Sequence, residues 1–310
     1  EEDLYSAWVR DHWTVDFLER PGTPYQDILV DCADTGYAMR IIYSAERALP
    51  FAMQDISGGR RTISQSMNRW DSLPPAQRLR SFIGYVQRFG NSHTTLPNDT
   101  YPLAMNRTAI RSGAVLVAHP EHHHSWTVKE IDQVGIPHLI YSSRPAATHL
   151  MTFNGFPSFG FLFLDHDHYR PRSNAGFRWF RQPQYIGIPA SQVPGFSLEQ
   201  YSLPEGTDWA YTAQQRLWVV PETPQQGLTR LWNSACELAR LRVTAVQQGL
   251  DFLRTQPESE CESYEDWDNF STPNRDERLQ DAFEELPRYT RMVQGVEGVR
   301  SSMEYRRARE

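Results

Sequence analysis

The chain has 310 residues, of which 39% are hydrophobic and 12% aromatic, and this globular composition can bury a large core. Its formal net charge of −7 provides no broad basic surface for a phosphate backbone, so we expect no nucleic-acid partner. Because the sequence has no run of about 18 apolar residues, we also expect no membrane span.

Helices are predicted in the first ninety residues. Apolar residues recur at roughly helical spacing over residues 1–20. From Cys32 to Leu49, small and apolar positions fall on one face at 3.6-residue spacing until Pro50 stops the pattern. Residues 77–89 show a third helical pattern. Cys32 is therefore predicted to stand at the start of a helix.

Strands are predicted after Gly113. Apolar stretches at residues 114–117, 126–131 and 138–141, with a turn at Gly135, predict a β meander. Residues 159–164 could add one more strand, because they are also apolar.

The C-terminal third is predicted to be mainly helical. Apolar residues step by threes and fours from Trp232 to Leu253, and a hydroxyl followed by proline at 271–273 marks a second helix start. Prolines and polar residues accumulate over residues 190–224, which indicates a domain boundary. We expect an α+β chain with one domain over residues 1–190, carrying an insertion at about 52–111, and a linker and mainly helical region over residues 191–310.

The run Asp31-Cys32-Ala33-Asp34 is the candidate catalytic motif. A helix N-terminus favours the thiolate, which is the nucleophilic form of cysteine, so we expect a lowered pKa for Cys32. The nucleophile needs a base, and histidines 122–124 stand at the edge of a predicted strand. His124 is placed best, because it would start the strand facing inward. The ordinary alternatives are a small core residue for Cys32 and a surface histidine for His124.

A helix that opens with Asp-Cys-Ala-Asp, then a polar insertion, then a strand that opens with histidine resembles the NlpC-type branch of the papain-like cysteine hydrolases. The resemblance covers about residues 25–145. It implies a papain-like catalytic domain with Cys32 as nucleophile and His124 as base, and no cofactor. It also implies a third polar residue on the strand 137–142, for which we choose His138, with Tyr141 and Ser142 as alternatives.

An oxyanion hole requires hydrogen-bond donors where negative charge develops. Gln26 lies six residues before Cys32, which is the spacing of papain-type peptidases. The NlpC branch typically uses a tyrosine further upstream, for which Tyr25 is the nearby candidate. An ordinary loop amide is the simpler interpretation of Gln26.

A metal site is the rival hypothesis. Imidazole and carboxylate groups suit zinc or a similar ion, and they gather in two clusters, His119, His122, His123 and His124, and Asp165, His166, Asp167 and His168. Neither cluster has a recognised ligand spacing, and adjacent strand residues point to opposite faces. Solvated loop histidines explain both clusters more simply, so we expect no metal. The aromatic run 176–181 could line a substrate groove, although packing on the core is the better interpretation.

The two cysteines that remain are Cys236 and Cys261. A disulfide between them would close about 26 residues and leave Cys32 as the free thiol. Such a bond forms in oxidising compartments, so we expect a periplasmic or secreted location.

These observations predict a cysteine hydrolase that cleaves amide bonds through a Cys32 thioester. The resemblance implies peptide or isopeptide bonds of bacterial cell-wall peptidoglycan as the substrate. A protein deamidase or a transglutaminase-like acyl transferase would use the same Cys-His site, and a catalytically silent binding protein is the alternative from another class. For catalysis we expect a ring nitrogen of His124 within about 4 Å of the Cys32 sulfur, with the other nitrogen turned toward His138 or its strand neighbours.

Overall fold

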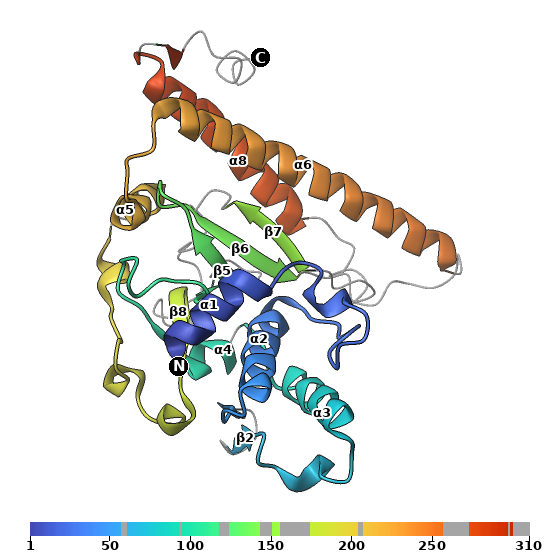
Figure 1. Cartoon of the computed structure of the whole chain (residues 1–310). Helices are drawn as coiled ribbons and strands as arrows, with labels where there is room; N and C mark the ends of the chain where they lie inside the picture. The colour runs from blue at the N-terminus through green and yellow to red at the C-terminus, as the bar shows by residue number, and fades with distance from the viewer. Residues whose placement is uncertain are drawn as a thin grey trace.

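The computed structural model describes most of the chain. The described residues are 1–56, 61–92, 95–117, 124–142, 151–155, 174–203, 207–256, 273–296 and 298–299. They form helices and antiparallel sheets, so the α+β class is confirmed (Figure 1). No helix among them is long and apolar enough to cross a membrane.

A six-stranded antiparallel sheet forms the centre of the protein (Figure 1). Its strands, in spatial order, are β3 (Thr100–Pro102), β8 (Gly176–Phe180), β4 (Val115–Val117), β5 (Ser125–Ile131), β6 (Pro137–Ser142) and β7 (Met151–Gly155). The predicted meander is confirmed, because β4, β5 and β6 are neighbours in this order. The possible strand at 159–164 lies outside the described residues.

Helix α2 (Cys32–Glu46) packs against this sheet. Its side chains are almost all buried from Ala33 onward, because the helix has the sheet on one side and other helices around it. Gly36 lies on the sheet side, where an added Cβ would be 3.4 Å from the Phe180 ring and 3.7 Å from Val115. The face of the sheet that carries Val115 is therefore the face that α2 covers.

Shorter elements surround α2. They are α1 (Glu2–His12), the 3-10 turn η1 (Phe17–Glu19), the hairpin β1 (Ala52–Gln54) and β2 (Thr62–Ser64), η2 (Asn68–Trp70), α3 (Pro75–Gln87) and α4 (Thr95–Asp99). The C-terminal end of α1 is tied to β5 by the Lys129 ammonium, which donates to the carbonyl oxygens of Val9 at 2.8 Å and Trp13 at 2.5 Å. A cation satisfies carbonyls that have no partner within the helix.

The remaining helices are α5 (Thr207–Leu217), α6 (Pro224–Thr255) and α8 (Pro273–Val293), preceded by the turns η5 (Pro183–Tyr185), η6 (Ala190–Gln192) and η7 (Glu199–Ser202). Thr223 begins α6 with a capping box, in which its hydroxyl accepts from the Gln226 backbone N–H and Pro224 is the first helical residue. The predicted helical character of the C-terminal region is thus confirmed.

Two separate apolar cores support this arrangement. The larger core joins the sheet, α1 to α3 and α5 as far as Leu217. The smaller core lies between α6 and α8 and consists of Leu228, Leu231, Leu286, Tyr289, Val293 and Val299. The helices approach closely at Gly227, where a Cβ would lie 2.1 Å from the Tyr289 hydroxyl, so only glycine fits there.

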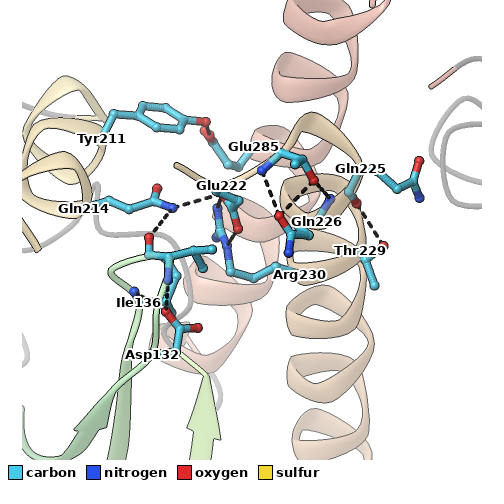
Figure 2. Close-up of polar contacts among 12 residues, drawn as sticks. Asp132, Ile136, Tyr211, Gln214, Glu222, Gln225, Gln226, Thr229, Arg230 and Glu285 are labelled. Carbon is cyan, nitrogen blue, oxygen red and sulfur yellow. Dashed lines mark hydrogen bonds and ion pairs between the residues drawn. The ribbon is translucent and has the colours of Figure 1, made fainter. Parts of the chain in front are cut away.

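A polar cluster connects the two cores (Figure 2). Glu222 forms an ion pair with Arg230 of α6 at 2.8 Å and accepts from the Gln214 amide of α5 at 3.0 Å. The same amide donates to the carbonyl oxygen of Val134, in the turn between β5 and β6, at 3.1 Å. Tyr211 of α5 donates to Glu285 of α8 at 2.8 Å. The helical pair is therefore attached to the sheet through α5.

Candidate functional site

The start of α2 is built by reciprocal capping. The Asp31 carboxylate accepts hydrogen bonds from the backbone N–H groups of Ala33 and Asp34, each at 3.0 Å. The Asp34 carboxylate accepts in return from the backbone N–H of Asp31 at 3.3 Å. This capping box fixes the first turn of the helix and holds Cys32 as its first residue. The predicted placement of Cys32 at a helix start is confirmed.

The Cys32 sulfur lies between two serines that come from distant parts of the chain. Its thiol donates to the Ser92 hydroxyl at a sulfur–oxygen distance of 3.9 Å. Ser125, the first residue of β5, also lies beside the sulfur, where its backbone and its hydroxyl favour the thiolate, although the hydroxyl makes no regular hydrogen bond. The fold therefore brings the helix start against the residue that follows His124 in the sequence.

The acidity of this thiol differs from the expectation. Burial, and next the neighbouring Asp31 carboxylate, raise the pKa of Cys32 to about 11, while the polar groups of Ser125 and Ser92 oppose the rise. The predicted lowered pKa is wrong, because desolvation of the sulfur outweighs the effect of the helix N-terminus. Cys32 is a neutral thiol at pH 7.

His124 is buried just before the start of β5, and its ring packs on aromatic neighbours. The ring centroid lies 4.5 Å from that of Trp126 and 5.3 Å from that of Tyr141, both edge-on. Because strand residues alternate, His124 shares a face with Trp126, whereas Ser125 points to the other face, toward Cys32. Within the described chain the sulfur hydrogen-bonds to Ser92 and lies beside Ser125, and no contact between the sulfur and His124 is seen.

His138 is not the residue that orients His124, and this prediction is wrong. It pairs with Glu130 across the β5–β6 ladder and contacts the Asp132 carboxylate at 3.4 Å. Glu130 lies six residues along β5 from His124, which corresponds to roughly 20 Å at the usual rise per residue. The alternative Tyr141 does reach the His124 ring, and the other alternative, Ser142, is buried at the end of β6.

Gln26 does not point toward the thiol. Its side-chain oxygen accepts from the backbone N–H of Gly22 at 3.0 Å, so it closes a local turn as an ordinary loop amide. Tyr25 is also occupied, because its ring stacks on Phe17 at 4.8 Å and its hydroxyl donates to Glu46 at 3.2 Å. The described side chains with donors that act on the sulfur are instead those of Ser92 and Ser125.

These two serines differ in how far the sequence indicates their place beside Cys32. Ser125 follows His124 directly, so strand alternation could have placed it on the face opposite the histidine. Ser92 lies inside the insertion, and no motif around it indicates a contact with Cys32.

Metal binding receives no support from the described part of the chain, which contains no group of three or more His, Cys, Asp or Glu residues arranged to hold an ion. His119, His122 and His123, and the cluster at 165–168, lie outside the described residues. The aromatic run at 176–181 is β8, and its strand residues are all buried. Phe177 stacks on Trp209 and Trp179 contacts Tyr5, which confirms packing rather than a groove.

Cys236 is a free thiol on α6, which contradicts the expected disulfide with Cys261. Cys261 itself lies outside the described residues. The internal argument for an oxidising compartment is therefore lost.

No family model, curated protein or solved structure matches the chain. The likeness to NlpC-type hydrolases thus rests on the residues around Cys32 and His124.

Proposed function

We propose that the protein is a cysteine hydrolase of amide bonds, with Cys32 as the nucleophile and His124 as the base. The observation that carries this proposal is the contact between Cys32, at the capped start of α2, and Ser125, next to His124 at the start of β5. These segments are 92 residues apart in the sequence, and a thiol at a helix start beside a histidine-led strand is the arrangement that papain-like hydrolases use.

The chemistry follows the usual course of nucleophilic catalysis by a thiol. His124 faces away from Cys32 in this structure, so this step requires the backbone before β5 to turn over and to move the ring from Trp126 and Tyr141 to the sulfur. The ring then accepts the thiol proton as the sulfur attacks the substrate carbonyl. The amine leaves with that proton, and a thioester remains on Cys32. Water, deprotonated by His124, then releases the acid and restores the thiol. A neutral resting thiol suits this course, because the proton is removed during the attack.

Three side chains complete the proposed site. Tyr141 lies against the His124 ring in the resting arrangement and can hold the ring there, whereas His138 does not reach it. The hydroxyls of Ser92 and Ser125 lie beside the sulfur and can donate to the oxyanion, in place of Gln26. The resemblance to NlpC-type hydrolases supports peptide or isopeptide bonds of peptidoglycan as the substrate and a periplasmic or secreted location.

The test is hydrolysis of purified peptidoglycan fragments, followed by mass spectrometry of the products. The unaltered protein should cleave them, and Cys32→Ala should reduce cleavage to background. Cys236→Ala is the matched control, because it removes the other described thiol, far from the site in the sequence, and should leave the rate unchanged. Ammonia release without cleavage would indicate the deamidase alternative. Cleavage that survives Cys32→Ala would refute the proposed mechanism.

A catalytically silent binding protein is the second candidate. The raised pKa of Cys32 favours this candidate, because a cysteine with a purely structural role is also a neutral thiol among buried neighbours. Calorimetry with the same fragments separates the two candidates. A silent protein should bind them equally with and without Cys32→Ala and release no product.

A further inference from the structure

Helix α6 carries two adjacent apolar stripes. The first stripe includes Leu228, Leu231, Ala235, Ala245 and Gly249, which are buried on the side of the helix that packs against α8. The second consists of Cys236, Ala239, Val243, Val246, Leu250 and Leu253, and we call it the outer stripe. Its positions alternate by three and four residues, so they follow one face of the helix.

The C-terminal half of the outer stripe is uncovered in the described structure. Val243 is 69% exposed, Val246 38%, Leu250 45% and Leu253 50%. Single exposed apolar residues are common, but four in register over three turns are the pattern of a helix that meets another helix. Figure 1 shows α8 along the N-terminal half of α6, whereas the C-terminal half extends beyond the start of α8.

We propose that two copies of the chain associate through the outer stripe, with their α6 helices antiparallel. The sizes of the side chains support this orientation. In the antiparallel register that sets Val243 opposite Val246 of the second copy, Ala239 faces Leu250 and Cys236 faces Leu253. Ala239 and Cys236 then each meet a leucine, and the two valines meet each other. The two-fold symmetry repeats every pair, so the side-chain sizes are matched across six layers.

The charged residues beside the outer stripe support the same orientation. Arg240 and Asp251 border the outer stripe on the same side, and Asp251 already accepts from Gln247 at 2.9 Å and Arg254 at 2.6 Å. In the same antiparallel register Arg240 lies within one helical turn of Asp251 of the second copy, twice per dimer. A parallel pair in register would place Arg240 against Arg240 of the second copy, and these like charges would repel each other. Both the apolar and the charged residues therefore favour self-association in one orientation.

Sedimentation analysis of the full chain tests the association. The unaltered protein should sediment as a dimer at micromolar concentration, and Val243→Lys should halve the measured mass. Thr244→Lys is the matched control, because it adds the same charge to the next exposed position, off the stripe, and should leave the dimer intact. A monomer at all concentrations, or a dimer that tolerates Val243→Lys, would overturn the proposal.

Cross-linking tests the orientation. Leu253→Cys should give a dimer on a non-reducing gel after mild oxidation, through a bond between Cys236 and the new thiol of the second copy. Adding Cys236→Ala should abolish the cross-link. If the cross-link persists without Cys236, the helices are parallel or meet elsewhere, and the antiparallel proposal fails. Circular dichroism should show unchanged helix content in every variant, because the altered positions are exposed or, for Cys236, half-buried.

Discussion

The thiol of Cys32 is subject to opposed effects. The N–H groups at the start of α2 favour a thiolate, whereas burial and the Asp31 carboxylate disfavour it and raise the pKa to about 11. With that pKa about one thiol in ten thousand is ionised at pH 7, compared with a few per cent for an ordinary cysteine. Reaction at neutral pH then depends on a base that removes the proton during the attack.

Alkylation by iodoacetamide should therefore be slow at Cys32 and steeply dependent on pH. We expect the rate to rise about tenfold per pH unit from neutrality toward about pH 11, because the thiolate is the reactive form. Peptide mapping after timed alkylation measures this rate, and Cys236 in the same digest is an internal reference. A rate that levels off near pH 8 would contradict the raised pKa.

The Asp31 carboxylate caps α2 and also raises the pKa of Cys32, and a substitution can separate these two effects. Asp31→Ser keeps an N-cap oxygen for the backbone N–H groups of α2 but removes the negative charge beside the sulfur. The pKa of Cys32 should fall, and alkylation at a fixed alkaline pH should become faster. Asp71→Asn removes an exposed carboxylate elsewhere and should leave the alkylation rate unchanged. Slower alkylation in Asp31→Ser would show that the cap, rather than the charge, governs the thiol.

The spacing of apolar residues predicted most helices and strands but not the residues that contact Cys32. Helices α2, α3 and α6 and the strands β4 to β6 followed from the spacing of apolar residues, because that spacing is a local property of the chain. The partners of Cys32 did not, because Ser92 reaches the sulfur only through the packing of the insertion. His138 was misassigned for a similar reason: the turn at Gly135 fixes the register of β5 and β6, and this register places His138 at the end of the ladder away from His124.

Asp99 shows how elements around α2 are linked by one buried carboxylate. It accepts from the Tyr37 hydroxyl of α2 and from the backbone N–H of Gln54 in β1, each at 2.9 Å. Burial raises the pKa of Asp99 from 3.8 to about 7, against the lowering effect of these hydrogen bonds and of Arg181. The folded protein thus holds the proton more tightly than the unfolded chain does.

Stability should consequently fall as the pH rises between these two pKa values. The contribution of Asp99 to the free energy of unfolding is full below about pH 4 and is lost by about pH 7, a change on the order of 4 kcal/mol. Urea unfolding of the unaltered protein and of Asp99→Asn measures this change. The difference in the free energy of unfolding between the two proteins should vary with pH across that window. Asp71→Asn is the control for an exposed carboxylate. A constant difference would show that Asp99 has an ordinary pKa in the folded state.

The whole molecule is organised by its two apolar cores. The larger core ends with α5 at Leu217, and the smaller one begins with α6 at Leu228. The sequence placed a boundary over 190–224 from composition alone, which could not show that α5 packs on the sheet through Trp209. Between the cores, the ion pair of Glu222 and Arg230 and the amide of Gln214 form one connection, and the hydrogen bond from Tyr211 to Glu285 forms another.

The buried ion pair of Glu222 and Arg230 can be broken by one substitution and replaced by two. The side chains of Glu222 and Arg230 are largely buried, so removing one leaves the other charged and without its ion pair, at a cost of about 3 kcal/mol. We expect Glu222→Leu to lower the protection of α6 and α8 from hydrogen exchange, while β4 to β6 keep theirs, because the larger core does not include the helical pair. Adding Arg230→Met should restore most of the loss, since an apolar pair of similar volume replaces the ion pair without a buried charge. If Glu222→Leu weakens the strands as much as the helices, the two cores unfold as one unit, and the polar cluster holds the whole molecule together rather than attaching the helical pair.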